Sequence, residues 1–292
     1  MKDNNYVVFT DSCCDLNPDI IEDNNIKVIR MMFRVDEKDY YDYADNREMN
    51  PHTFYNKLRD GKLSKTTQIT PITYIKELTP YLKDEKDIIL TVFSSALSST
   101  YNSAMTAAAT LREEFPERKI EVIDTLSASG GQGFFVYNIA KNQAKGMSFE
   151  KNVKWALENR LHVAHWFTID DLNFLRRGGR LTAGKAWLGT LLSLKPVLRV
   201  NDLGQLVPDQ NVRGRKQSLL TMAKHFGETA IEPKKNAIMI LHADDEKSAH
   251  FLGDLLVQKY EVPEIIYGDI GPVIGSHSGQ DTIALFFFAS KR

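Results

Sequence analysis

IILTVFSSALSSTYNSA, residues 88–104, is the stretch that points most directly to a fold class. It begins with an apolar run, Ile88–Phe93, that has the length and the β-branched content of a buried strand. Four serines and a threonine follow within residues 94–100, and from Tyr101 on the alanines recur at helical spacing. A strand, a hydroxyl-rich turn and a helix in this order are typical of a parallel sheet that binds a ligand at the carboxyl ends of its strands.

The hydroxyl groups of residues 94–100 suit an anion, because the first backbone N–H groups of a helix are free to bind one. The simplest alternative is that these serines only cap the helix, since serine is a favoured N-cap residue. One cap needs fewer hydroxyls than this turn provides. We therefore interpret the turn as a binding site, with Ser95 and Ser98 as candidate ligands.

The composition is that of an ordinary globular protein. Of the 292 residues, 42% are hydrophobic and 26% are charged, and the length suggests about two domains. The net charge of −1 argues against a nucleic-acid-binding surface as the main function, so no nucleic-acid partner is expected. The two cysteines, Cys13 and Cys14, are adjacent, which excludes a zinc site built from spaced pairs and a disulfide framework.

Hydropathy predicts no signal peptide and no membrane span. The N-terminal sequence lacks an apolar signal core, and the longest uncharged apolar stretch, Ile283–Ala289, is too short to cross a bilayer. Together with two cysteines that fit a reducing compartment, these features predict a cytoplasmic protein.

The first half of the chain alternates strands with helices. Strands are predicted at Tyr6–Thr10, Ile26–Phe33, Ile88–Phe93 and Ile120–Asp124. Loops rich in hydroxyl groups, acids or glycine are predicted at Glu37–Asn50, Ser64–Pro71 and Thr125–Gly133. This alternation predicts a doubly wound parallel sheet between two layers of helices, a three-layer α/β/α domain.

The second half has a different pattern, which predicts a mixed sheet. Val197–Val200 and Leu206–Pro208 flank a short turn and form a hairpin signal. Helices and strands alternate further on, and the last segments are a glycine-rich turn at Gly271–Gln280 and a strand at Thr282–Ala289. Hairpin and alternating signals together indicate a mixed sheet with helices on one face.

We therefore expect an α/β fold of two domains. Residues 1–160 would form the N-terminal α/β/α domain, and residues 161–292 the C-terminal α/β domain. The linker between them is barely marked in the sequence.

Hydroxyl groups, rather than acid–base pairs, dominate the loops of the first half. None of the candidate residues is a lysine or a histidine, and a hydroxyl without a base is a poor nucleophile but a good hydrogen-bond donor. The candidates are Asp11, Ser12, Thr66, Thr67, Gln68, Ser95, Ser98 and Ser127. This set favours binding over acyl transfer.

The glycine-rich segment RRGGRLTAGKA, residues 176–186, allows two interpretations. Its spacing resembles a phosphate-binding P-loop, but Ala186 stands where a serine or threonine should hold magnesium. A helix C-terminus capped by one of its glycines accounts for most of the segment. Arg180 lies beyond that cap, and it is the better partner for an anion.

GSHSG, residues 275–279, places His277 among small residues. It looks like a nucleophile elbow, but the central serine of that motif is missing. A histidine in such a turn can approach a ligand closely and donate to a carboxylate or phosphate; a structural role is the alternative. Arg213, at the start of a basic helix, belongs either to a solvated surface or to a docking face.

Taken together, eight short motifs resemble the DegV family, the fatty-acid-binding subunits of bacterial fatty acid kinase, over nearly the whole chain. In order, they are TDSCCDL (10–16), TTQITP (66–71), SSALSSTYNSA (94–104), DTLS (124–127), FLRRGGRL (174–181), LKPVL (194–198), VRGRK (212–216) and GPVIGSHSGQ (271–280). The resemblance departs at Ser99, where the family usually has glycine, and at Cys13 and Cys14, which replace smaller residues.

The resemblance implies a carrier that buries one long-chain fatty acid as its ligand, with no other cofactor and no metal. The acyl tail would lie in an apolar tunnel, mostly in the second domain. A separate ATP-dependent subunit of fatty acid kinase would phosphorylate the carboxylate to an acyl phosphate, so the chain itself would have no catalytic residue. Transient contact with a membrane surface is expected of such a carrier.

The resemblance also assigns roles to individual residues. Thr66, Ser98 and His277 look like the carboxylate ligands, Arg180 supports them, and Arg213 looks like part of the kinase-docking face. Candidate tunnel walls, each equally a core residue, are Phe167, Phe174, Leu188, Leu191, Leu192, Leu194, Phe286 and Phe288. The alternatives are a carrier of another small lipid or anion and a phosphotransferase in its own right.

Overall fold

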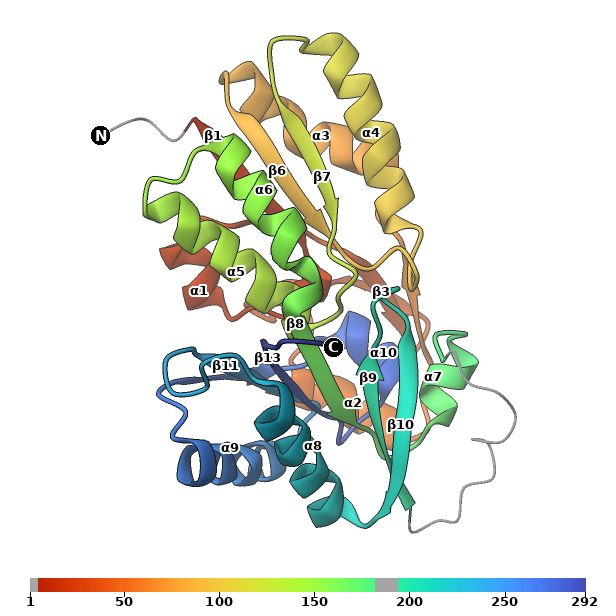
Figure 1. Ribbon diagram of the computed structural model, residues 1–292. Coiled ribbons are helices and arrows are strands. Elements are labelled where there is room, and N and C mark those ends of the chain that lie inside the picture. Colours follow the sequence, from red (N-terminus) through yellow and green to blue (C-terminus); the bar gives the residue numbers. More distant parts are fainter. Residues whose placement is uncertain (1–4, 182–193) are drawn as a thin grey trace.

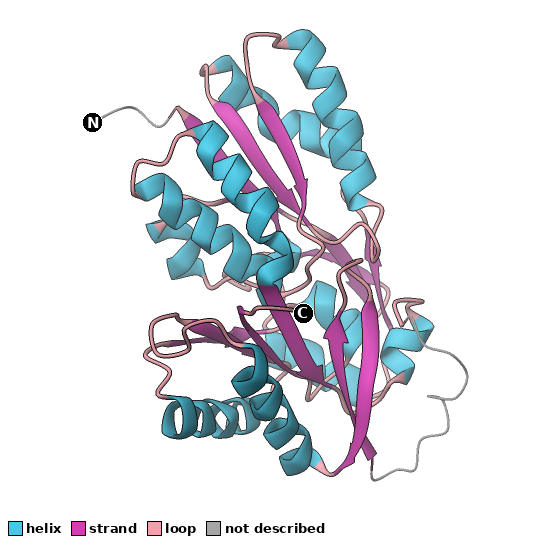
Figure 2. Cartoon of the chain, in the orientation of Figure 1, coloured by secondary structure: helices cyan, strands magenta, loops and turns pink. Residues whose placement is uncertain are grey.

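The chain folds into two α/β halves that meet along a broad contact (Figure 1). The computed structural model describes residues 5–181 and 194–292. Within these ranges the strands form a four-stranded, a six-stranded and a three-stranded sheet (Figure 2). The predicted fold class is confirmed, with a parallel sheet in the first half and a mixed sheet in the second. The three-stranded sheet was not predicted.

The four-stranded sheet is parallel throughout, in the order β2-β1-β6-β7. Its strands are β1 (Tyr6–Asp11), β2 (Lys27–Ile29), β6 (Asp87–Val92) and β7 (Ile120–Asp124). Helices α3 (Pro71–Lys83) and α4 (Thr100–Glu114) cover one face, and α5 (Gly130–Ala144) and α6 (Phe149–Asn159) cover the other (Figure 1). The same stretch of sequence contains two shorter helices, α1 (Pro18–Asp23) and α2 (Pro51–Arg59).

The three-stranded antiparallel sheet has the order β4-β3-β5, with β3 (Met32–Val35), β4 (Lys38–Tyr41) and β5 (Ser64–Thr67). The predicted strand Ile26–Phe33 is therefore wrong as a single element, because β2 and β3 belong to different sheets. The predicted loops Glu37–Asn50 and Ser64–Pro71 are also wrong, since they contain β4 and β5. Asp36 and Glu37 both have positive φ, 55° and 62°, which gives the tight turn between β3 and β4 without a glycine.

The six-stranded sheet is mixed, in the order β10-β9-β8-β13-β11-β12. Its strands are β8 (Val163–Thr168), β9 (Leu194–Val200), β10 (Leu206–Arg213), β11 (Ile238–His242), β12 (Ile265–Asp269) and β13 (Ile283–Phe288). β11 and β12 pair in parallel, and the other pairs are antiparallel. The predicted hairpin is confirmed as β9 and β10. Helices α7 (Asn173–Arg177), α8 (Arg215–Thr229) and α9 (Glu246–Tyr260) belong to this half.

The two faces of the six-stranded sheet pack against different halves of the chain. On β13, Leu285 and Phe287 point to a core formed with α8 and α9. The alternate residues Ala284 and Phe286 belong to a core that includes α5 and the parallel sheet. This period of two follows from the strand geometry. The domain boundary near residue 160, just after α6, stays a prediction.

The predicted glycine-rich turn at Gly271–Gln280 is wrong, because most of it forms a helix, α10 (Pro272–Ser278). Pro272 occupies a first-turn position, where its missing N–H costs no hydrogen bond. Gly279 ends the helix with a φ of +78°. The helix was not predicted because glycine has no side chain and so contributes nothing to the hydrophobic periodicity from which helices are recognised. Among the described residues, no helix is both long enough and apolar enough to cross a membrane.

Candidate functional site

A partly open cavity lies between the two halves; its empty space, counted out into solvent, is about 780 Å³, and most of its walls are apolar. Among the predicted wall residues, Phe167 and Phe286 line it, whereas Phe174, Leu194 and Phe288 do not. Leu188, Leu191 and Leu192 lie outside the described residues. Other apolar lining residues are Cys13, Met31, Phe93, Leu97, Ala128, Leu175, Val200, Leu206, Ile270, Val273, Ile274 and Ala284.

Four of the predicted ligand residues line this cavity together, and we call them the polar end: Thr66, Ser98, Arg180 and His277. The hydroxyl oxygen Oγ1 of Thr66 lies 2.9 Å from Nε2 of His277. Arg180 donates from Nε to the carbonyl of Leu97 at 3.0 Å, which holds the guanidinium beside the turn that carries Ser98. Four separate segments of the chain thus bring hydroxyl, imidazole and guanidinium groups to one place.

The unpredicted small sheet positions Thr66. Ser64 and Thr66 lie two residues apart on β5 and therefore point to the same face. On that face Oγ of Ser64 lies 2.6 Å from Oγ of Ser276, next to the contact between Thr66 and His277. These two contacts hold β5 against α10. The position of Thr66 at the polar end therefore depends on how β5 is aligned in the small sheet.

His277 is uncharged at neutral pH. Burial lowers the pKa of its imidazole to about 4, and the positive charge of Arg180 adds to this shift. Its Nδ1 is buried and has no hydrogen-bond partner among the described residues. A Cβ at Gly178 would lie 2.3 Å from that nitrogen, so only glycine allows this close approach. The positive charge of the polar end therefore comes from Arg180.

The serines of residues 94–100 have different surroundings. Ser98 lines the cavity, and its Oγ also accepts from the backbone N–H of Thr100, the first residue of α4, at 3.2 Å. Ser94 is buried and donates to the carbonyl of Gly204 at 2.8 Å. Ser95 is exposed, and its N–H bonds to Asp124 outside the cavity. The ligand role of Ser95 stays a prediction that no cavity contact supports.

Comparisons with known proteins agree on one family. A family model described as "Uncharacterised protein, DegV family" matches residues 5–290. A DegV domain-containing protein of Clostridium perfringens is 37% identical over 287 residues, which cover 98% of each chain. The chain belongs to the DegV family.

Solved structures of DegV proteins share the fold over the same length. The fatty-acid-binding DegV protein of Thermus thermophilus superposes with a TM-score of 0.88 at 29% identity, covering 98% of this chain and 99% of that one. The fatty acid kinase B3 protein of Streptococcus pneumoniae, solved with linoleic acid, gives 0.83 at 19% identity, covering 97% and 99%. At that identity the second likeness supports the fold alone.

The sequence of this DegV chain did not reveal every polar or sulfur-bearing residue at its cavity. Cys13 and Met31 line it, as do Ser129, His165 and Ser278. Cys13 could have been predicted from the sequence. It lies two residues after β1, as Ser94 lies two residues after β6, and both positions are at the carboxyl edge of the parallel sheet. His165 is two residues before Phe167 on β8 and shares its face.

The predicted docking residue of the DegV chain, Arg213, ends β10 at the surface. Its side chain is exposed, and it forms no ion pair with any residue in the ranges 5–181 and 194–292. Its neighbour Arg215 instead contacts Asp170. Arg213 is thus available to a partner, and its docking role stays a prediction.

A second hollow lies on the other side of the short 3₁₀ turn η1 (Ser12–Cys14), and we call it the acidic recess. It is lined by Cys14, Asp15, Asp42 and Asp269, among others. Burial raises the pKa of Asp42 to about 7 and raises that of Asp15 well above its usual value. Among the described residues, no three histidine, cysteine or acidic side chains are arranged to hold a metal ion.

Asp15 links the recess to the rest of the site. Its Oδ1 accepts from the N–H of Gly271 at 3.0 Å, and its Oδ2 accepts from the hydroxyl of Ser129 at 2.5 Å. These bonds connect η1 with the starts of α10 and α5. The carboxyl of Asp15 therefore fixes the position of α10, whose other end carries His277.

Proposed function

We propose that this DegV chain is a fatty-acid carrier that presents the carboxylate of its bound acid to a separate ATP-dependent kinase subunit, which forms the acyl phosphate. The observation that carries the proposal is the cavity between the halves, whose walls are mostly apolar and whose lining includes the cluster Thr66, Ser98, Arg180 and His277. The fatty-acid-binding DegV protein of Thermus thermophilus shares this fold over the full length, which supports the same ligand class here.

The apolar walls supply the affinity. Burying an acyl chain of about sixteen carbons contributes roughly 12 kcal/mol, at about 0.8 kcal/mol per methylene, before the entropic costs of binding are subtracted. A buried carboxylate without hydrogen-bond donors would cancel much of that gain. The tail therefore needs a headgroup site of the kind that the polar end offers.

The polar end supplies hydrogen-bond donors, and none of its four residues carries a negative charge that would repel a carboxylate. The hydroxyl groups of Thr66 and Ser98 can each donate one hydrogen bond to a carboxylate oxygen. Arg180 provides the positive charge, and the neutral imidazole of His277 orients Thr66 through their 2.9 Å contact. The proposal gives the chain no catalytic residue, no nucleotide site and no metal of its own.

The partner and the location follow from the same proposal. Arg213, exposed at the end of β10, would contact the kinase subunit. A cytoplasmic carrier would meet both ATP-dependent enzymes and the inner surface of the membrane, where it would load or release its acid by transient contact.

Two alternatives make different predictions. A carrier of another small lipid or anion would use the same cavity with a different ligand. A phosphotransferase would need the segment around Lys185 and Ala186, which lies outside the described residues. No contact of the described residues favours the second alternative.

Mass spectrometry of lipids extracted from the purified protein tests the ligand class. We expect a long-chain fatty acid to co-purify, or palmitate and oleate to bind when added. A protein that holds neither, or that holds a different lipid and rejects both acids, would refute the proposal. Hydrolysis of ATP by this chain alone with magnesium would instead favour the phosphotransferase.

Reconstitution with a fatty acid kinase subunit, ATP and loaded carrier tests presentation of the carboxylate. The triple variant Thr66→Ala, Ser98→Ala, His277→Ala should keep part of its tail-driven affinity but lose acyl-phosphate formation. Arg213→Glu should bind fatty acid normally and form acyl phosphate more slowly, whereas Lys151→Glu, an exposed charge reversal on α6, should change neither. Normal acyl-phosphate formation by the triple variant would show that the headgroup site is misassigned.

A further inference from the structure

The loop that follows β6 belongs to the first half but is bound by the second half at two points. We call its residues 94–98 the serine turn. At one end of it, Oγ of Ser94 donates to the carbonyl of Gly204, in the turn between β9 and β10, at 2.8 Å. Near the other end, Nε of Arg180 donates to the carbonyl of Leu97 at 3.0 Å. The serine turn is therefore held across the boundary between the halves.

Ser94 also determines the shape of the serine turn from within. Its carbonyl accepts from the N–H groups of Leu97 at 3.0 Å and Ser98 at 3.1 Å. Its own N–H donates to the carbonyl of Ser127 at 3.0 Å, and its Oγ accepts from the N–H of Ala96 at 3.3 Å. The side chain is fully buried, with an exposed fraction of 0%. Ser94 thus connects the backbone of Ser98 to the end of the parallel sheet and to the second half.

Gly204 allows the turn between β9 and β10 to come this close. A Cβ at Gly204 would lie 2.2 Å from Oγ of Ser94 and 3.1 Å from Cα of Leu126, and the φ of +73° also favours glycine. Arg292 supports the same approach, because its Nη1 donates to the carbonyls of Leu126 at 2.6 Å and Asn201 at 3.4 Å. The bond between Ser94 and Gly204 therefore lies at a tight contact of the two halves.

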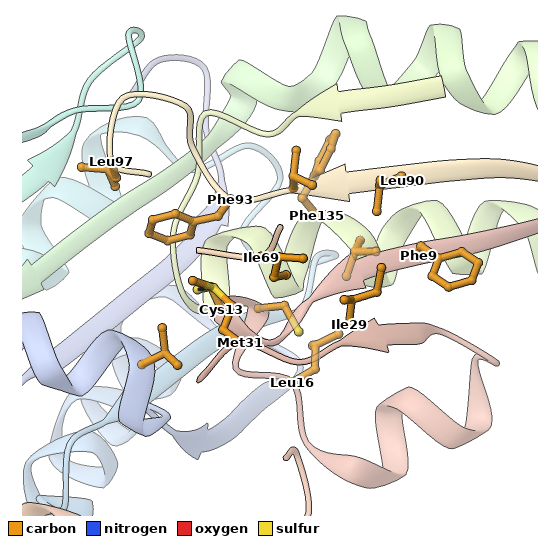
Figure 3. Packing of buried hydrophobic residues seen from close by; sticks show 14 of the residues in the cluster. Phe9, Cys13, Leu16, Ile29, Met31, Ile69, Leu90, Phe93, Leu97 and Phe135 are labelled. Atoms are coloured by element: carbon orange, nitrogen blue, oxygen red, sulfur yellow. Dashed lines mark hydrogen bonds between the residues drawn. The ribbon is translucent and has the colours of Figure 1, made fainter. Parts of the chain in front are cut away.

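Apolar packing holds the serine turn against the cavity but does not orient its hydroxyl groups. Phe93 and Leu97 are buried in the cluster that Figure 3 shows, and both line the cavity. Hydrophobic burial is not directional, whereas hydrogen bonds depend on angle. The hydroxyl of Ser98 contacts Thr100, but that contact lies within the first half. The position of Ser98 relative to the second half therefore depends on the bonds that Ser94 makes.

We infer that Ser94 is a positioning residue of the headgroup site, which holds the hydroxyl of Ser98 in place through its bond to Gly204. This inference rests on the proposed fatty-acid ligand. Arg180 and His277 belong to the second half and Ser98 to the first, so a carboxylate that contacts them all requires a fixed distance across the boundary. A hydrogen bond weakens steeply when its angle or distance is wrong, so a loosened Ser98 would lose most of its bond to the ligand.

Ser218, on α8, provides a matched control. Like Ser94 it has an exposed fraction of 0%, and its Oγ also donates to a backbone carbonyl, that of Arg215, at 2.8 Å. It does not line the cavity. Ser94→Ala and Ser218→Ala therefore each remove one buried hydroxyl and one hydrogen bond of the same length. A difference between them in ligand binding would reflect the headgroup site and not the general cost of the deletion.

The experiment is a double-mutant cycle on the palmitate affinity of the full chain, measured by isothermal titration. Ser94→Ala and Ser98→Ala should each weaken binding about fivefold, the loss of roughly one hydrogen bond. The double variant should also lose about fivefold and not about twenty-five-fold, because a residue that acts through Ser98 has no further effect once that hydroxyl is gone. Ser218→Ala should bind like the wild type. Gly204→Ala should resemble Ser94→Ala, since its Cβ would displace the hydroxyl of Ser94.

The outcomes separate this inference from the proposed function. Wild-type affinity in Ser94→Ala, multiplied losses in the double variant, or an equal loss in Ser218→Ala would each overturn the inference and leave the carrier function standing. If Ser98→Ala alone binds like the wild type, Ser98 is not a headgroup ligand and the inference fails with that assignment. If the wild-type protein does not bind palmitate, the proposed function itself fails. Should Ser94→Ala not fold, the same cycle with Gly204→Ala in its place decides.

Discussion

The cavity and the acidic recess lie on opposite sides of the same three-residue turn, η1. Cys13 faces the cavity and Cys14 faces the recess. The cavity is lined by two histidines and the recess by carboxyl groups, and in both regions burial favours the uncharged form. It lowers the pKa of His277 to about 4 and raises that of Asp42 to about 7. Both regions thereby lose charge on folding, one by keeping a base neutral and the other by retaining protons.

The two regions should consequently respond to pH with opposite signs. A histidine whose pKa is lower in the folded state stabilises the fold less as the pH falls below its unfolded value of about 6.5. An acid whose pKa is raised in the folded state stabilises the fold less as the pH rises through the folded pKa. Separating these contributions by mutation tests whether the contrast between the regions is real.

The largest effect is expected in the acidic recess. Asp42 is buried, and its Oδ2 has no hydrogen-bond partner among the described residues. Asp42→Asn removes a charge that folding disfavours, so the free energy of unfolding at pH 8 should rise by on the order of 3 kcal/mol. The gain should shrink as the pH falls from 7 toward 4, measured by urea unfolding at several pH values.

Asp45 is the control for that variant. It lines the same recess but is exposed and pairs with Arg47, which lowers the pKa of its carboxyl. Asp45→Asn should therefore destabilise the protein by at most on the order of 0.5 kcal/mol, without a pH dependence above pH 5. Equal behaviour of the two variants would remove the distinction between a buried and a solvated carboxyl.

A smaller effect of opposite sign is expected at the polar end. Between pH 6.5 and pH 4 the unfolded chain takes up a proton at His277 that the folded chain rejects, so wild-type stability should fall with pH. His277→Gln removes this component, which we expect to be about 2 kcal/mol. Urea unfolding at pH 5 and pH 7 measures it. An unchanged difference between these two pH values would show that His277 is not held neutral by the fold.

The smallest effect separates two neighbouring threonines. Thr66 contacts His277 in the cavity, whereas Thr67 points to the other face of β5 and is exposed. Thr66→Val should weaken palmitate binding about fivefold to tenfold, the loss of roughly one hydrogen bond, while Thr67→Val should leave it unchanged. Isothermal titration measures both. Similar losses in the two variants would place the headgroup elsewhere.

The elements with strong apolar periodicity were predictable from the sequence. Ile120–Asp124 was predicted with the boundaries that β7 has. The small sheet was not predictable in this way, because β5 is a short polar strand. Thr66 pairs with Phe33, so the strand is defined by a distant partner and not by its own pattern.

The site was predictable in residue type more than in geometry. Hydroxyl-rich turns and a family resemblance selected Thr66, Ser98, Arg180 and His277, and the fold brings these four together. Ser95 shows the limit, because it shares a turn with Ser98 but points to solvent. Which side chains of a turn face a cavity depends on backbone angles that residue types alone do not determine.

The position of β13 bears on how the protein is made. This strand pairs with β8 on one side and β11 on the other, yet it follows both in the chain. Until the ribosome has released it, β8 and β11 expose two unpaired sheet edges, and the wall that carries Ala284 and Phe286 is missing. A chain in which β13 has not yet been made therefore lacks part of the cavity wall, and its open edges are a site for chaperones or for aggregation.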